Sequence, residues 1–390
     1  MSSYISSNAN RFYTALESTY GQVGSITSDN RIPALKLMVQ QQLEKADRKD
    51  KTGSRTFGGV PWGGRRRTNF ELRTYLTTWQ PASGSPAYGP LLQAALGGGP
   101  ASFAGGSASS STQAGRLTFA TGHGLSAGQA VSAGGEMRFV AAIVDPTTVQ
   151  LNAPFSAALA ANAPVGRTVS YAPATELPSV SVYDYWSPET AVQRLLSGAA
   201  VDEMEILVNG DYHEVRFKGL AQDVIDSSSF SAQMGQLSSF PAEPALGAFD
   251  FSIVPGNLGQ AWLGTTAAQF LTITSASVKL KNNLETRARE FGTRMPRAIT
   301  PGRREVTAEF ELYSMDDEGT TSLYQAARQQ SPISVMFQLG EVPGQMMGVY
   351  LKSVVPEVPE FDDGDNRLQW KFRSSKAQGT VDDEIAVAFA

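Results

Sequence analysis

The sequence predicts a mainly β protein with two tandem domains of the β-sandwich or barrel-forming type, short helices, and a small inserted all-β module. Two runs in the second half, residues 271–280 and 305–313, alternate apolar and polar side chains with the period of half-buried strands. A similar pair of runs occurs in the first half. A nearly uncharged segment of short alternating runs, residues 116–175, lies between the two halves.

Composition defines the broad class of protein. The chain has 390 residues, of which 41% are hydrophobic and 18% charged, so it can build folded cores in roughly two or three domains. A net charge of −5 does not suggest a protein that binds nucleic acid tightly, because tight binding of nucleic acid needs a basic surface. The absence of cysteine excludes disulfides, cysteine-ligated zinc and thiol catalysis. We find no secretory signal and no apolar run of about 20 residues, which predicts a soluble protein folded in a cytoplasm, with no membrane partner.

The first hundred residues contain two predicted strands and one helix. Residues 32–43 and 65–77 have strand periodicity, and a charged and glycine-rich stretch separates them. Residues 90–96 contain good helix formers and end at three glycines, which predicts a helix that stops there. The Gly/Ser/Ala-rich residues 101–113 are typical of a flexible linker.

The inserted module and the segment after it contain further predicted elements. Ser187 and Pro188 are suited to the N-cap and first turn of a helix, which we expect over residues 187–196. Asn209-Gly210 is a preferred pair for a tight hairpin turn. The remaining predictions are strands at 116–120, 129–132, 137–144, 148–151, 168–171, 203–209, 212–220, 333–339, 348–355 and 367–373, and a helix at 320–330.

Short matches at nearly constant spacing indicate an internal duplication. Leu43-Glu44 recurs as Leu284-Glu285, and Phe70-Glu71-Leu72 recurs 240 residues later at 310–312. Gln93-Ala94-Ala95 recurs 232 residues later at 325–327, whereas residues 215–218 best match 349–352, only 134 residues later. The drop in spacing predicts 98 residues present only in the first copy. The predicted domains are therefore 1–100 with 176–244, an inserted module at 101–175, and 245–390.

The second-half motif resembles a known protein family. ITSASVKLKNNLETRAREFG, followed by PRAITPGRREVTAEFELY, resembles tail tube proteins of long-tailed, siphovirus-like bacteriophages, and YTALESTYG is similar to the way such chains open. The resemblance covers about two thirds of the chain, the two β domains. It implies a virion protein, assembled in the host cytoplasm, that polymerises into stacked rings forming a conduit for DNA ejection.

The resemblance also implies an assembly. The inner strands of neighbouring domains would join into one barrel around a channel, three duplicated chains would form a pseudo-hexameric ring, and the module would lie outside. Loops 44–65 and 285–303 would reach the adjacent ring. Tail-tip, tape-measure and terminator proteins are the implied partners, together with passing DNA that is not bound specifically. The candidate inter-ring or inter-subunit residues are Arg48, Arg65, Arg66, Arg287, Arg289, Arg303 and Arg304.

No pattern in the sequence indicates an enzyme, a metal site or a cofactor. The two histidines, His123 and His213, lie in different predicted domains, and the acidic turn 362–365 lacks the spaced ligands of a calcium loop. There is no nucleotide-binding glycine motif and no nucleophile elbow. Two alternatives stay open: another β-rich virion component, such as a tube terminator, baseplate or decoration protein, or a carbohydrate-binding adhesin that binds through 116–175.

Overall fold

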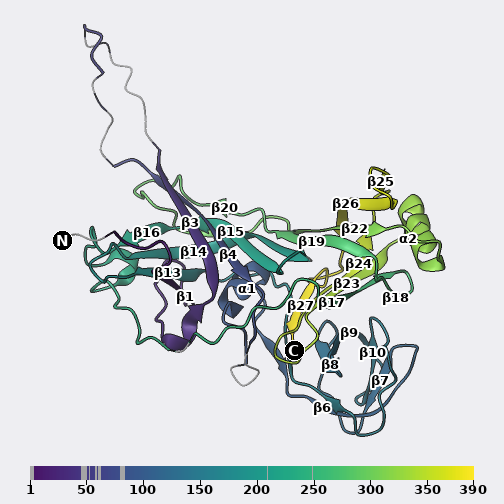
Figure 1. Cartoon of the computed structure of the whole chain (residues 1–390). Coiled ribbons are helices and arrows are strands. Elements are labelled where there is room, and N and C mark those ends of the chain that lie inside the picture. Colours follow the sequence, from purple (N-terminus) through teal and green to yellow (C-terminus); the bar gives the residue numbers. More distant parts are fainter. Residues whose placement is uncertain are drawn as a thin grey trace.

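The computed structural model describes residues 4–44, 51, 53–57, 59, 63–79, 84–208, 210–247 and 249–390. Figure 1 shows a β-rich molecule in which the helices are short. The first part contains β1 (Asn10–Leu16), β2 (Arg31–Ile32), β3 (Ala34–Leu43), β4 (Arg66–Tyr75), α1 (Gly89–Leu96) and β5 (Ala101–Phe103). The inserted barrel contains β6 (Gly106–Ser111), β7 (Arg116–Phe119), β8 (Ala130–Ala133), β9 (Glu136–Ile143), β10 (Thr148–Leu151) and β11 (Pro164–Val165). After it come β12 (Thr168–Tyr171), β13 (Val180–Trp186), β14 (Arg194–Val208), β15 (Glu214–Ala221) and β16 (Asp223–Asp226). The second half contains β17 (Gly259–Gly264), β18 (Ala268–Gln269), β19 (Ile273–Lys281), β20 (Glu285–Thr286), β21 (Ile299–Thr300), β22 (Glu305–Tyr313), α2 (Glu318–Gln329), β23 (Ile333–Leu339), β24 (Met347–Val355), β25 (Glu360–Asp362), β26 (Gln369–Ala377) and β27 (Ala386–Phe389).

Eight antiparallel strands form one continuous sheet across both halves of the chain. Their order is β3–β4–β15–β14–β19–β22–β26–β25. The alternation predicted from the sequence is observed, because Phe70 and Leu72 in β4 and Phe310 and Leu312 in β22 are buried while the residues between them are not. One face of the sheet therefore covers the core and the other face is polar.

Strand β14 joins two layers. Its first residues, 194–199, pair with β13 and β16, and its last residues, 203–208, lie between β15 and β19. In the second half β24 has a similar arrangement, because it pairs with β23 and β27 at its start and with β26 at its end. Buried side chains of the second layer and of the eight-stranded sheet belong to one hydrophobic core.

The two halves contain the same pairings in the same chain order. In the first half the pairs are β3–β4, β4–β15, β15–β14, β14–β13, β13–β1 and β14–β16. In the second half they are β19–β22, β22–β26, β26–β24, β24–β23, β23–β17 and β24–β27. A helix follows β4 in one half and β22 in the other.

The helices α1 and α2 bury corresponding faces. Leu91, Ala94 and Ala95 are buried in α1, as Leu323, Ala326 and Ala327 are in α2. These are the helices predicted from residues 90–96 and 320–330. α1 ends as expected at Gly97, whose φ is 93° and where a Cβ atom would lie 2.5 Å from a backbone oxygen, so only glycine fits there.

The inserted module is a near-closed barrel with strand order β11–β6–β7–β10–β9–β8. A bridge between Ser132 and Gly166 brings β8 next to the β11 end. The prediction of a flexible linker at 101–113 is wrong, because β5 and β6 lie in it. Small side chains allow close strand packing there, and Ala108 is fully buried in the barrel core. Strand β12, which we expected in the module, pairs instead with β5 and the C-terminal strand β27.

The predicted helix at 187–196 is also wrong. The chain turns after Trp186 and enters β14 at Arg194, where Leu195 and Leu196 are both buried between β13 and β16. Strand pairing on both edges overrides the local helix signals. The predicted hairpin of β14 and β15 is present, but β15 begins only at Glu214, so its loop is longer than a tight turn, and Asn209 lies outside the described residues. We expected the last strand at 367–373, and the sequence patterns did not reveal β27.

Candidate functional site: the polar face of the sheet

Charged side chains of opposite sign face one another across the polar face of the eight-stranded sheet. At the centre of this face, Glu203 of β14 forms an ion pair with a lysine of each neighbouring strand. The Lys218 ammonium lies 2.9 Å from one oxygen and the Lys279 ammonium 3.0 Å from the other. Two cations thus share one carboxylate at the place where the sheets of the two halves meet.

The same pattern continues toward both ends of the sheet. Arg216 lies 3.4 Å from Glu205, and Arg373 lies 2.8 Å from Glu311. At the far edge, Lys371 contacts Asp362 at 2.5 Å. Opposite charges directly across neighbouring strands stabilise a sheet by roughly 0.2–1 kcal/mol per pair.

The central ion pair shifts the pKa values of Glu203 and Lys218. Burial opposes the change, yet hydrogen bonds from Lys218 and Lys279 hold the pKa of Glu203 below its ordinary value. The hydrogen bond to Glu203 raises the pKa of Lys218. Glu203 and Lys218 therefore stay charged and paired near neutral pH. A paired cation offers a weaker contact to a passing phosphate than a free one.

No group of three or more His, Cys, Asp or Glu residues in the described part of the chain is placed to hold a metal ion. His123 is buried in the barrel, where its Nε2 lies 3.0 Å from the carbonyl oxygen of Asp145. His213 is buried with its Nε2 3.2 Å from the carbonyl oxygen of Leu258. Both contacts are structural. None of the described helices has the length and apolar character needed to cross a bilayer.

Comparison with known proteins identifies the family. The model of the family described as "phage tail tube protein" matches residues 7–389. The chain belongs to the phage tail tube protein family. It is a structural, non-enzymatic component of the virion that self-assembles into the tail tube. A solved structure, the hybrid NMR and electron-microscopy structure of the SPP1 tail tube, is similar over 34% of this chain and 79% of that one, with 14% identity and a TM-score of 0.27. A search of curated proteins found no match.

The arginines predicted for assembly of the tail tube protein do not form one site. Arg304 is largely buried and binds Asp382, Glu384 and the carbonyl oxygen of Ala174 within the same chain. Arg66, another of the predicted arginines, forms an ion pair with Asp223 at 3.0 Å. Both side chains are therefore held by intrachain contacts.

The other predicted arginines lie in or beside the two long loops. Arg65 donates to the carbonyl oxygen of Arg289, so the two loops touch each other within one chain. Arg287 pairs with Glu290, and Arg303 is exposed. Arg48 lies outside the described residues. The charged residues of the polar face were not predicted from the sequence, although their placement at alternate positions of predicted strands was a usable signal.

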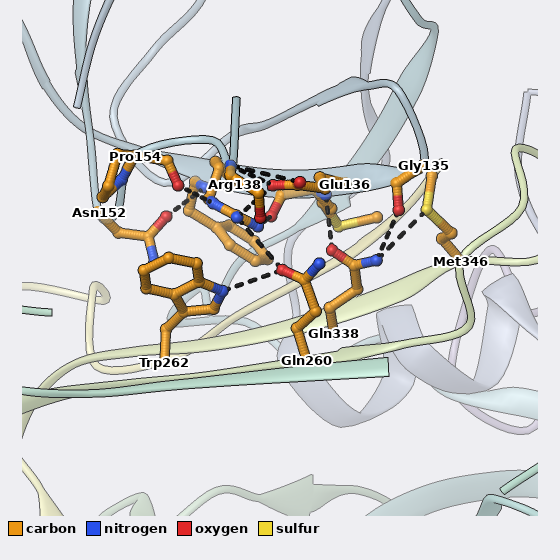
Figure 2. A network of polar contacts seen from close by, with 12 residues as sticks. Gly135, Glu136, Arg138, Asn152, Pro154, Gln260, Trp262, Gln338 and Met346 are labelled. Carbon is orange, nitrogen blue, oxygen red and sulfur yellow. Dashed lines mark hydrogen bonds and ion pairs between the residues drawn. The ribbon is translucent and has the colours of Figure 1, made fainter. Parts of the chain in front are cut away.

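The barrel of this tail tube protein is anchored to the second half by a buried polar network (Figure 2). The side chain of Arg138 has no exposed surface, and its guanidinium bonds the carbonyl oxygens of Pro154 and Met137, the carboxylate of Glu136 and the amide oxygen of Gln260. It also lies 4.5 Å from the centre of the Trp262 ring. Nearby, the Gln338 amide binds the backbone of Gly135 and Met137. Burial lowers the pKa of Arg138, and Glu136 opposes that change.

Proposed function

We propose that each chain carries two tandem tube domains and that three chains close into one pseudo-hexameric ring of the tail tube. The observation that carries this proposal is the β14–β19 junction, which makes the sheets of the two halves continuous. It leaves β3 at one end of the sheet and β25 at the other, and neither has a second strand partner along its outer edge among the described residues. Exposed edges of this kind are an aggregation hazard unless another strand covers them.

The repeated set of pairings supports the tandem domains, with 1–100 and 176–244 as the first, 245–390 as the second and 101–175 as the insertion. α1 ends at Leu96 and β13 begins at Val180, whereas α2 ends at Gln329 and β23 begins at Ile333. The extra residues of the first copy thus lie between its helix and the following strand. The pairings also make β15 the counterpart of β26, and not of β24 as the sequence match at 215–218 implied.

We assign the polar face of the sheet to the lumen. Several of its cations are engaged by carboxylates, as in the pairs of Lys218 and Lys279 with Glu203, so the lining would offer DNA fewer free positive charges. DNA held by many phosphate contacts would not slide, because each contact adds affinity. The barrel packs against β17, β23, β24 and β27, in the layer on the other side of the core. This packing supports our expectation that the barrel lies on the outside of the tube.

The loops 44–65 and 285–303 remain our candidates for contacts between stacked rings. Of the predicted arginines, Arg287, Arg289 and Arg303 have the exposure that such a contact requires. Tail-tip, tape-measure and terminator proteins would meet the same surfaces at the two ends of the tube.

Electron microscopy of the purified protein tests this proposal. We expect stacked rings, and class averages viewed along the axis should have three-fold symmetry with three barrels outside the wall. Six chains per ring would refute the tandem arrangement, because twelve domains would then surround the channel.

A further inference from the structure

The internal junction between β14 and β19 provides a template for the contact between chains. Resting on the proposed ring, we infer that β25 of one copy pairs antiparallel with the outer edge of β3 of a second copy, with Phe361 opposite Leu43 and Asp362 opposite Gln42. The partner is thus another copy of this chain, and the junction repeats the one already present inside it.

Within one chain, the template has a defined register. Met204 of β14 lies opposite Leu280 of β19, and Glu205 lies opposite Lys279. Met204 and Leu280 have no exposed surface. The junction therefore has an apolar pair on the core face and a charged pair on the polar face.

Strand β25 occupies the place of the last part of β14. The pairs Val354 with Ala377 and Phe361 with Trp370 belong to one continuous register, so β25 extends β24 along β26 as the end of β14 extends along β15. The cross-strand ladder then fixes the equivalence of individual residues. Lys218 lies between Glu71 and Glu203, and Lys371 lies between Glu311 and Glu360. Glu360 thus corresponds to Glu203, and Phe361 to Met204.

Strand β3 occupies the place of β19. Val39 lies opposite Phe70 of β4, and Ala276 lies opposite Phe310 of β22, the residue that corresponds to Phe70. Counting along both strands without a register shift, Leu43 corresponds to Leu280. Leu43 is the last residue of β3. The strand pairings thus make Leu280 its counterpart, whereas the sequence match had paired it with Leu284.

In the isolated chain, the residues that correspond to the buried pair of the internal junction are exposed. Met204 and Leu280 are fully buried, whereas Phe361 is 57% exposed and Leu43 is 53% exposed. The Phe361 ring stacks on Trp370 with ring centres 5.4 Å apart, and Tyr324 of α2 lies beside both rings. A cluster of aromatic rings thus lies at the β25 edge of the sheet, and the apolar side chain of Leu43 lies at the β3 edge. Pairing the two edges buries both, and a head-to-tail contact of this type closes into a ring.

The inferred register makes the contact between chains weaker than the internal one. It places Glu44 opposite Glu360, where the internal junction has Lys281 opposite Glu203. Like charges directly opposite one another destabilise a strand pair. Glu44→Lys should therefore strengthen assembly and lower the critical concentration for ring formation by about three- to tenfold.

Disulfide trapping tests the register, because the chain has no native cysteine. In the variant Gln42→Cys/Asp362→Cys, the two cysteines lie at opposite ends of an eight-stranded sheet, about 30 Å apart at the usual strand spacing, so they cannot join within one chain. We expect oxidised assemblies to yield covalent dimers and trimers on non-reducing gels. The internal pair Glu205→Cys/Lys279→Cys is the positive control and should cross-link within a monomer. The pair Gln40→Cys/Asp362→Cys is two residues out of register and should not cross-link.

The outcomes separate this inference from the proposed ring. Rings that form normally but never cross-link through residues 42 and 362 would overturn the inferred junction and leave the ring intact. A wild-type protein that forms no rings under the microscope would instead refute the proposed ring. Phe361→Asp provides a second measurement: we expect a folded monomer with at least a tenfold loss of assembly. Val144→Asp, which changes an exposed apolar residue of the barrel, should assemble normally.

Discussion

Replacing Arg138 with methionine should destabilise the protein by about 3–5 kcal/mol, the usual cost of removing one partner from a buried ion pair. The guanidinium makes four kinds of contact that methionine cannot make: with Glu136, with two backbone carbonyls, with Gln260 and with the Trp262 ring. Because methionine retains the length of the apolar stem, the loss comes from unpaired polar groups and only to a small extent from a cavity. The Glu136 carboxylate, 15% exposed, is left without its cation.

The assay is chemical and thermal unfolding followed by circular dichroism. An unfolding entropy of about 2.1 cal/mol/K per residue implies that this loss lowers Tm by roughly 4–6 °C if the chain unfolds in one transition. Arg116→Met, at an exposed position of the same barrel, is the matched control and should change stability by less than about 0.5 kcal/mol. The double variant Glu136→Gln/Arg138→Met should be less destabilised than the sum of its single changes.

The result that would refute this reasoning is an Arg138→Met variant within about 1 kcal/mol of the wild type. It would mean that water or a rearranged Gln260 satisfies the polar groups around the site. The barrel would then be held mainly by the apolar contacts of Met137 and Phe139 with Met336 and Tyr350, and the buried network would have little role in anchoring it.

Three further predictions follow from the sheet, the buried histidine and the second helix. Glu203→Gln should release Lys218 and Lys279, so that assembled tubes retain DNA in low salt and lose it as salt is raised; equal DNA retention by variant and wild-type tubes would contradict a lumenal position. Burial lowers the pKa of His213, so the unfolded chain binds more protons than the folded chain between that lowered pKa and about 6.5. Stability should therefore fall as pH drops through this window, and His213→Gln should flatten the fall, as measured by urea unfolding between pH 7 and 5. Asp317→Ala removes the N-cap of α2, whose carboxylate accepts from the Thr320 amide at 2.6 Å, and should cost about 1 kcal/mol. If the urea concentration at the unfolding midpoint does not change, packing alone stabilises this helix.

Local patterns were sufficient to predict many of the elements. β4 and β22 were predicted because a half-buried strand alternates apolar and polar side chains, and this alternation is visible in consecutive residues of the sequence. The helix α1 was predicted because good helix formers end at a glycine that the fold requires. The failures at 101–113 and 187–196 have a common cause, since pairing with distant strands determined both segments against their local composition.

The candidate site shows the same division. Alternating charges in β14, β15 and β19 are visible in the sequence, but it does not say that Glu203 lies between Lys218 and Lys279, because each partner comes from a different strand. Arg304 was expected at a surface and is engaged inside the chain, since the C-terminal carboxylates that bind it are nearly eighty residues away.

The sequence by itself determined the β-rich class, the family resemblance, the recurring strand and helix motifs and the absence of thiol chemistry, because these depend on composition and on neighbours along the chain. Only the tertiary structure decided that the two halves share one sheet, that a buried arginine anchors the inserted barrel, and that Leu43 and Phe361 are exposed at opposite edges. These features depend on strand register and burial between residues far apart in the chain, and a single sequence does not contain those distances.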